Sequence, residues 1–328
     1  MKKLIALLLA LVMVFGLVAC GSTEPVSTDT PASDAPAAET SEEEKLTVGL
    51  ALAALNTNAV FIDMRKEIEA RCEESGYKLM TADIEAGPAA IVTALENFIN
   101  GGCDIIIVQN SAEEACADLL QQAVDKGIIV ASYDYPSEIC QYACVCANYD
   151  VGYAIGEQMG KFCAENEGSK KVAICSYTSL DFLVEREQGM RDGFAAACPE
   201  GEIVMAQDAG YASEGVTAGE NFLQACPDIQ GVMGINDGGI MGVYEAFKAA
   251  GKSFEKDGIA LIGCDASVDG INAMKEGDMF YCTIDLDLIN QVGEMYERCV
   301  TAALTGEIDA EKAIVTYPAV PLFQEDVQ

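Results

Sequence analysis

From position 45 onward, short apolar runs rich in β-branched residues alternate with longer stretches in which apolar residues recur every three or four positions. The first pattern is typical of buried strands and the second of amphipathic helices. The predicted strands are Leu46–Ala53, Lys78–Ala82, Asp104–Gln109, Ile128–Tyr133, Ala143–Ala147, Lys171–Tyr177, Glu202–Gln207, Gly231–Ile235, Gly258–Gly263 and Met279–Ile284. The predicted helices are Phe61–Ser75, Ala89–Ile99, Ala112–Lys126, Ala154–Glu165, Glu187–Ala197, Gly215–Cys226, Ile240–Ala250 and Gln291–Thr305. This alternation predicts an α/β fold of parallel sheets with helices on both faces.

The number of predicted strands exceeds what one such sheet would hold in a body of this length. We therefore expect two lobes, each built around its own parallel sheet, that meet near Ala147–Tyr149. No short-period repeat is apparent, although the two lobes follow a similar rhythm.

The N-terminus has the pattern of an export signal. Lys2 and Lys3 precede an unbroken apolar run from Leu4 to Val18. As a helix this run would rise about 22 Å. It contains fewer than the roughly 20 residues that a helix needs to span a bilayer, so the run is typical of a secretory signal. Its end, Leu17-Val18-Ala19-Cys20-Gly21-Ser22, resembles the bacterial lipoprotein cleavage box. The resemblance implies that residues 1–19 are removed and that Cys20 is lipidated; the alternative is an ordinary signal peptide that ends in Cys.

Residues 20–45 are expected to form a disordered acidic tether. They are mainly Ser, Thr, Pro, Ala and acidic residues, with too little aliphatic surface to fold. Acids in this segment would be repelled by an anionic membrane and would hold the body away from it. A structureless spacer with no further role fits the same composition.

Charge and composition exclude several classes of function. The chain has 53 Asp and Glu against 19 Lys and Arg, for a formal net charge of −34. This balance argues against nucleic acid as a partner and against adhesion of the body to anionic lipid. The chain contains no His, which removes Ser-His-Asp and Cys-His catalysis and most zinc sites.

The 14 cysteines are expected to be mostly buried thiols. Cys175, Cys264 and Cys282 lie in or beside predicted strands, where Cys acts as a small hydrophobic residue. The group 140–146 contains three cysteines that could form a disulfide or bind a metal. Because no matching CxxC pair and no His accompany it, we expect no metal site.

Polar and aromatic residues gather where predicted strands end. These residues are Asn58, Phe61, Asp134, Arg186 at the opening of a helix, Tyr211, Asn236 and Asp265. Ligands of open parallel sheets bind at this edge. Carboxylate, amide and guanidinium groups can each bridge two hydroxyls, and a ring can cover a C–H face, so the set suits a polyhydroxylated ligand.

Each of these residues also has a purely structural interpretation. An Asp or Asn after a strand is often the N-cap of the next helix. Tyr211 could be a rim aromatic, Phe61 a core residue, and Arg186 an ion-pair partner of Glu185 or Glu187. The argument for a ligand site therefore depends on their joint occurrence.

The body from Leu46 to about Gln324 resembles the periplasmic sugar-binding proteins of the ribose/galactose type, the substrate-binding components of ABC importers. The segments that carry the resemblance are Asn58-Ala59-Val60-Phe61, Gly76-Tyr77, Asp134 at the end of its strand, Asn148 in Ala147-Asn148-Tyr149-Asp150-Val151-Gly152, Arg186-Glu187-Gln188-Gly189-Met190, Tyr211, Gly234-Ile235-Asn236-Asp237 and Gly263-Cys264-Asp265.

The resemblance implies the type 1 periplasmic binding protein fold, with two Rossmann-like lobes joined by a hinge. The N-terminal lobe would comprise 46–147 and about 286–313, and the C-terminal lobe 148–285 and about 314–328. The sugar would be bound between them, without cofactor or metal, by Asn58, Phe61, Asp134, Asn148, Arg186, Tyr211, Asn236, Asp265 and Asp287. The closed monomer would then dock on the transmembrane subunits of a permease, with the lipid anchor as its only membrane attachment.

Departures from the family pattern leave the sugar open. Val60-Phe61 stands where the family often has two Phe rings, and Tyr135 stands where ribose binders carry an Arg. The segment 283–287 lacks the usual Gln, so Asp285, Leu286 or Asp287 could face the ligand. A pentose, a hexose or a cyclitol remains possible. A neutral ligand is expected, because one cation stands among several acids and no Gly-rich phosphate cradle is present.

Other functions fit parts of the pattern. A sensor that presents sugar to a membrane receptor or kinase would share the fold and the site. A sugar-responsive repressor would share the fold, but the signal peptide and the missing DNA-binding helix pair oppose it. Asp134 and Asp265 could also act as the acid/base pair of a glycosidase, although binding clefts carry paired carboxylates too.

Overall fold

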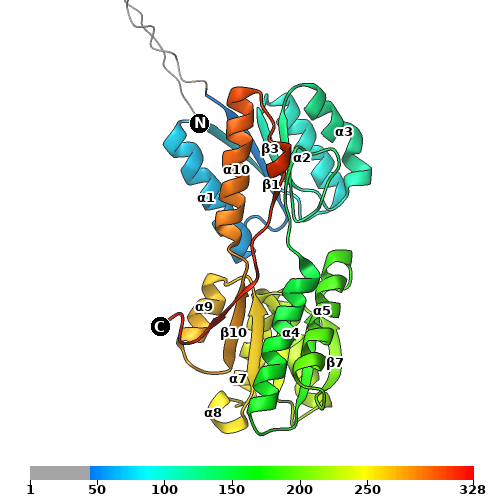
Figure 1. Cartoon of the computed structure of the whole chain (residues 1–328), viewed down its shortest axis with the longest axis vertical. Helices are drawn as coiled ribbons and strands as arrows, with labels where there is room; N and C mark the ends of the chain where they lie inside the picture. The colour runs from blue at the N-terminus through cyan, green and yellow to red at the C-terminus, as the bar shows by residue number, and fades with distance from the viewer. Residues whose placement is uncertain (1–44) are drawn as a thin grey trace, which may run out of the picture. The chain divides into compact units, whose positions relative to one another are not determined.

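The computed structural model describes residues 45–328. Its first six-stranded sheet has the strand order β11-β5-β4-β3-β1-β2, and every neighbouring pair is parallel. The strands are β1 (Thr47–Leu52), β2 (Lys78–Asp83), β3 (Ile105–Gln109), β4 (Ile129–Tyr133), β5 (Tyr142–Cys144) and β11 (Ile314–Val315). The associated helices are α1 (Ala59–Ser75), α2 (Pro88–Asn100), α3 (Glu113–Asp125) and α10 (Leu288–Thr305), with the 3-10 turn Ala310–Lys312. Helix α1 packs beside α10, and α2 packs beside α3 (Figure 1).

The second six-stranded sheet has the order β12-β10-β9-β8-β6-β7 and is parallel except for β12, which runs antiparallel to β10. Its strands are β6 (Lys171–Ser176), β7 (Glu202–Asp208), β8 (Gly231–Gly234), β9 (Ala260–Cys264), β10 (Phe280–Asp285) and β12 (Val320–Phe323). The helices are α4 (Asn148–Glu165), α5 (Asp181–Ala197), α6 (Ala212–Ala225), α7 (Asp237–Ala249), α8 (Phe254–Asp257) and α9 (Val268–Lys275). The predicted fold of two parallel sheets flanked by helices is confirmed.

The chain crosses between the two sheets after β5, after β10 and after β11. The third crossing lies later than predicted, because Ile314 pairs with Ala143 and Val315 pairs with Cys144 in the first sheet. The first lobe therefore extends to Val315 rather than to about residue 313. Strand β11 is only two residues long, which is too short to give a periodic signal in the sequence.

Several predicted helix starts were too late, and two of them by about six residues. Helix α5 begins at Asp181, so Arg186 lies in its second turn and does not open the helix as expected. Helix α4 begins at Asn148, directly after the first crossing, and not at Ala154. The first turn of α4 alternates polar and apolar residues, and that of α5 carries the apolar run Phe182–Val184, so neither shows the helical spacing of apolar residues.

Glycines allow α4 and α5 to pack backbone against backbone, and this packing places Arg186. A side chain at Gly152 of α4 would overlap the backbone carbonyl of Arg186, and one at Gly189 of α5 would overlap that of Tyr149. Gly156 and Gly193 repeat the contact one turn further along. The close approach keeps the start of α4 and the second turn of α5 in fixed register at the edge of the second sheet.

The core follows the expected pattern of sheets covered on both faces. Strands β3, β4 and β9 are buried at every position, as parallel strands between two layers of helices should be. All 13 cysteines of the part that the structure describes are free thiols, and 11 of them are buried. Cys175, Cys264 and Cys282 are completely buried, at the strand positions predicted for them.

Residues 1–44, including the predicted signal segment, Cys20 and nearly all of the tether, lie outside the described residues. Within the described residues, no helix has both the length and the apolar character that a membrane crossing requires.

Candidate functional site

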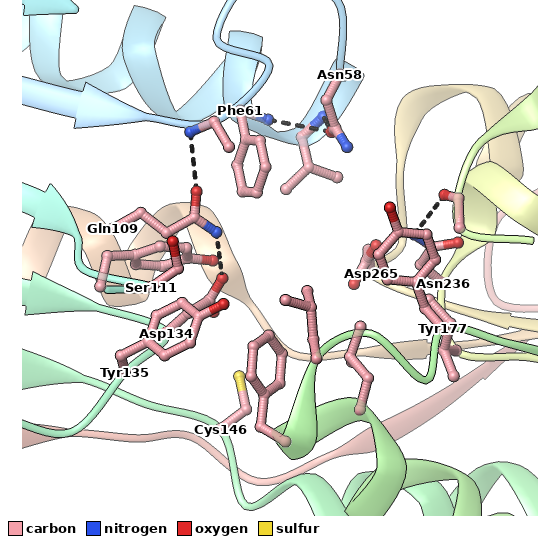
Figure 2. A pocket seen from close by; sticks show the side chains of 18 of the residues that line it. Asn58, Phe61, Gln109, Ser111, Asp134, Tyr135, Cys146, Tyr177, Asn236 and Asp265 are labelled. Carbon is pink, nitrogen blue, oxygen red and sulfur yellow. Dashed lines mark hydrogen bonds between the residues drawn. The ribbon is translucent and has the colours of Figure 1, made fainter. Parts of the chain in front are cut away.

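A cleft of about 370 Å³ is lined by residues from both sheets (Figure 2). This volume lies within the usual range for small-molecule sites. The predicted site residues that line it are Asn58, Phe61, Asp134, Arg186, Tyr211, Asn236 and Asp265. The structure therefore brings together the residues that follow separate strands in the sequence.

Asn58 lines the cleft and also caps helix α1. Its side-chain oxygen accepts hydrogen bonds from the backbone N–H of Val60 (3.0 Å) and of Phe61 (3.4 Å). Its side-chain amide N–H groups form no part of this cap and can serve a ligand. The ring of Phe61 meets the ring of Tyr133 edge to face at 6.3 Å, so one wall of the cleft has aromatic edges.

Asp134 follows β4 and is held by a residue that the sequence analysis did not select. Nε2 of Gln109, the last residue of β3, donates to Asp134 Oδ2 (2.8 Å). The side-chain oxygen of Gln109 accepts from the N–H of Ala53 (2.9 Å), which ties the ends of three strands together. Burial raises the pKa of Asp134 to about 6, against the opposing effects of the Gln109 hydrogen bond and of Arg186. The sequence feature that could have identified Gln109 as a site residue is its place as the polar last residue of an otherwise apolar strand.

Arg186 is buried, with only 6% of its surface exposed. Its Nε donates to Asn148 Oδ1 (3.0 Å), and its Nη1 donates to the carbonyl of Ile235 (2.6 Å). The predicted surface alternative does not hold, because Glu187 pairs with Arg191 instead. The guanidinium is thus fixed at the base of the cleft by uncharged acceptors, which leaves its charge available to a bound molecule.

Asn148 does not line the cleft but contacts Arg186, which does. It begins α4, and its Nδ2 donates to the carbonyl of Cys146 (3.2 Å) while its oxygen accepts from Arg186. The side chain therefore orients the guanidinium at the point where the chain crosses between the lobes.

Asn236 and Asp265 contribute the polar groups of the second lobe (Figure 2). Asn236 caps α7 by accepting from the N–H of Gly239 (2.9 Å), and its Nδ2 donates to the carbonyl of Gly210 (2.9 Å). Asp265 has a left-handed backbone with φ of 106°. Burial raises the pKa of its carboxyl, and the neighbouring Asp237 raises it further, whereas Arg186 lowers it.

Aromatic rings from both lobes line the cleft. Tyr211 is 38% exposed, and its ring meets that of Tyr177 edge to face at 6.1 Å. Phe182, from α5, meets Tyr135, from the loop after β4, at 5.0 Å between ring centres. Tyr177 and Phe182, which the sequence analysis did not select, therefore line the cleft together with the predicted rings of Phe61 and Tyr211.

The third crossing segment places Leu286, and neither neighbouring Asp, in the cleft wall. Asp287 has a left-handed backbone at the start of α10, and its carboxylate accepts from Asn290 Nδ2 (2.8 Å). The Asp285 carboxylate accepts from the Asp287 N–H (2.7 Å). Both carboxylates are thus engaged in local turns of the backbone.

The chemistry of the cleft is that of hydrogen bonding and ring stacking. Three carboxylates, of Glu85, Asp134 and Asp265, line a space bounded by aromatic rings, together with a guanidinium, two side-chain amides of Asn and one of Gln. Carboxylate and guanidinium groups make strong, directional hydrogen bonds to hydroxyls. No group of His, Cys, Asp and Glu suited to a metal ion occurs within residues 45–328.

Comparison with known proteins extends this description. Residues 48–306 match the model of the periplasmic binding protein domain family. The ribose import binding protein of Bacillus subtilis is 27% identical over 279 residues, covering 84% of this chain and 85% of that protein. A putative rhizopine-binding protein of Rhizobium meliloti is 30% identical over 213 residues, which cover 62% of this chain and 67% of that protein.

Solved structures share the fold at lower identity. A periplasmic solute-binding protein of Actinobacillus succinogenes with bound D-allose superimposes with a TM-score of 0.75 at 23% identity, over 86% of this chain and 99% of that one. The Caulobacter myo-inositol-binding protein gives 0.71 at 22% identity, over 84% and 92%.

The Bacillus subtilis relative is named as an import binding protein, which argues against the glycosidase interpretation of Asp134 and Asp265. The fold, the cleft between two sheets and the family match lead to the same assignment. The chain belongs to the periplasmic binding protein domain family.

Proposed function

We propose that this protein captures a neutral monosaccharide or a related polyol between its two lobes and delivers it to an ABC permease. The observation that carries the proposal is one cleft into which Asp134 comes from the first lobe and Arg186 and Asp265 from the second. A ligand that contacts both lobes favours the closed state by its differential affinity, a hinge motion for which periplasmic binding proteins are a standard example.

In the proposed complex, Asp134, Arg186, Asn236 and Asp265 hydrogen-bond ligand hydroxyls, and Phe61 and Tyr211 cover apolar faces of the ring. Asn58 contributes its free amide group, and Asn148 acts through Arg186. The hydrogen bonds of Asn148 and Gln109 support these roles, because each fixes a charged group at the base of the cleft. Asp287 is kept as a weaker candidate, since its carboxylate would have to leave Asn290 to reach a ligand.

The ligand class rests on chemistry and on the relatives together. Ribose, rhizopine, D-allose and myo-inositol appear in the names of similar proteins. All four fit a cleft that combines planar hydrogen-bonding groups with aromatic rings. Tyr135, at the position where ribose binders carry an Arg, favours a ligand other than ribose.

We further propose that the mature protein is a monomeric lipoprotein, anchored outside the cytoplasm through Cys20. The sequence around Cys20 supports this part of the proposal. Two acyl chains give stable anchoring, whereas a single chain gives only marginal binding. A sensor that presents the same sugar to a receptor or kinase is the alternative, and permease and ATPase genes beside this one would favour import.

Thermal unfolding with a panel of pentoses, hexoses, cyclitols, nucleosides and peptides tests the proposal. A ligand at about 1,000 times its Kd stabilises the folded state by roughly 4 kcal/mol. At this chain length each kcal/mol raises the Tm by about 2–4 °C. A shift with a sugar or cyclitol is the expected result. A shift with only a nucleoside or a peptide would contradict the proposed ligand class.

A further inference from the structure

The carboxylate of Asp237 is completely buried and does not line the cleft. Asp237 is the first residue of α7, directly after the capping residue Asn236. Its Oδ1 accepts from the hydroxyl of Thr283 (2.8 Å), and its Oδ2 accepts from the N–H of Ser267 (2.8 Å). A buried carboxylate is costly unless its oxygens are satisfied, so these donors define what the residue does.

Both donors connect Asp237 to the loop 265–267, which contains the cleft residue Asp265. Ser267 belongs to this loop, and Thr283 is hydrogen-bonded to it. Each of the three backbone N–H groups of this loop donates a hydrogen bond. The acceptors, in order, are the Ile284 carbonyl (2.9 Å), Thr283 Oγ1 (3.2 Å) and Asp237 Oδ2 (2.8 Å). The hydroxyl of Thr283 therefore accepts a hydrogen bond from the N–H of Ala266 in the loop and donates one to the carboxylate of Asp237.

The loop needs such anchoring because its backbone is strained. Asp265 and Ala266 have φ of 106° and 48° and are consecutive residues with a side chain in a region that favours glycine. Conformations of this kind persist only when the surroundings impose them. The fit around Asp237 is close, since a side chain at Gly263 or Gly270 would overlap its carboxylate oxygens.

We propose that Asp237, acting through Thr283 and Ser267, is a positioning residue that holds the loop 265–267 so that the Asp265 carboxylate faces the cleft. The inference rests on the proposed function only in assigning Asp265 to ligand binding. The anchoring of the loop is a property of the ligand-free protein and can be measured without any ligand.

Hydrogen exchange tests the anchoring. In the ligand-free full-length protein, Thr283→Val should accelerate exchange at the amides of Ala266 and Ser267 by roughly tenfold, because the bond to the hydroxyl is lost and the loop opens more often. Thr283→Ser keeps the hydroxyl and is the matched control, with exchange close to that of the original protein. Unchanged exchange in Thr283→Val would overturn the proposal.

Calorimetry with D-ribose, D-allose, myo-inositol and xylitol tests the consequence for binding. Thr283→Val should weaken binding of the sugar that the original protein takes by roughly tenfold, and Thr283→Ser by much less. In the Ala266→Gly background the loss should be smaller, because glycine adopts the left-handed backbone without an anchor. An equal loss in both backgrounds would show that Thr283 acts by another route.

One outcome separates this inference from the proposed function. If the original protein binds none of the pentoses, hexoses and cyclitols of the thermal-unfolding panel, the proposed ligand class fails, and the exchange experiment still decides the anchoring. If Thr283→Val does not fold, Asp237→Asn serves as the second variant, because it keeps the size of the side chain. Asp237→Asn should also speed exchange in the loop, and exchange at the original rate would overturn the proposal.

Discussion

The side-chain amide of Gln109 donates a hydrogen bond of 2.8 Å to Oδ2 of Asp134. Gln109 is the last residue of β3, and Asp134 directly follows the neighbouring strand β4. Asp134 has a left-handed backbone with φ of 65°, which turns its carboxylate toward the cleft. The arrangement satisfies one carboxylate oxygen inside the protein and leaves the other for a ligand. The ligand-free protein must therefore keep a carboxyl in a poorly solvated position.

This position predicts a pH-dependent stability. Burial raises the pKa of Asp134 from 3.8 to about 6. The folded protein then holds this proton more tightly than the unfolded chain, so the stabilisation is complete below about pH 4 and is lost as the pH rises through 6. Asp134→Asn should reduce this slope and make the ligand-free protein about 1–3 kcal/mol more stable at pH 7. Urea unfolding between pH 4 and 7 measures the difference.

Asp118→Asn is the control for this experiment, because Asp118 is an exposed residue of α3 outside the cleft. It should leave the slope unchanged. The same Asp134→Asn protein should lose most of its sugar affinity in calorimetry, since an amide offers one acceptor oxygen where a carboxylate offers two. A variant with lower stability at pH 7 and full affinity would contradict both roles of Asp134.

Arg186→Ala should abolish sugar binding. The side chain is fixed by Asn148 and the Ile235 carbonyl, and its guanidinium is the cation of the cleft wall. Some stability should also be lost, because the substitution leaves these buried acceptors without their donor. Calorimetry measures the affinity, and thermal unfolding shows whether the fold persists.

Arg191→Ala offers a matched control on the same helix. Arg191 is paired with Glu187 and lies outside the cleft wall. Its loss should lower stability, because it leaves the largely buried carboxylate of Glu187 without its cation, and should leave sugar affinity unchanged. Affinity retained in Arg186→Ala would remove Arg186 from the site.

The parts of the site that could be predicted are those with a strand-end signal. Asp134 and Asp265 follow apolar runs, so their place at the carboxyl edge of a sheet was readable. Gln109 still lies within its strand, and Phe182 lies in a helical turn whose period was not visible, so neither stood out. The choice of Leu286 over Asp287 depends on register, because a shift of one residue moves a side chain to the opposite face.

The strained loop after β9 predicts a stabilising substitution. Ala266 has φ of 48°, which costs an alanine more than a glycine. Ala266→Gly should therefore raise the free energy of unfolding by about 0.5–1 kcal/mol. Ala273→Gly, in the neighbouring helix α9, should lower it by about 1 kcal/mol or more, because glycine is unfavourable in a helix interior. Urea unfolding of the two variants should show opposite signs, and destabilisation by Ala266→Gly would refute the strain argument.

The proposed lipid anchor predicts where the protein is found in the cell. Cys20 follows the apolar run Leu4–Val18 in the sequence context of a lipoprotein cleavage box. Cys20→Ala should release the protein from the membrane fraction, because the acyl chains that would hold it can no longer be attached. Fractionation followed by immunoblotting measures the distribution. Cys140→Ala is the control, since Cys140 lies in the folded body and its loss should leave the protein with the membrane. Continued membrane association of Cys20→Ala would mean that another segment holds the protein there.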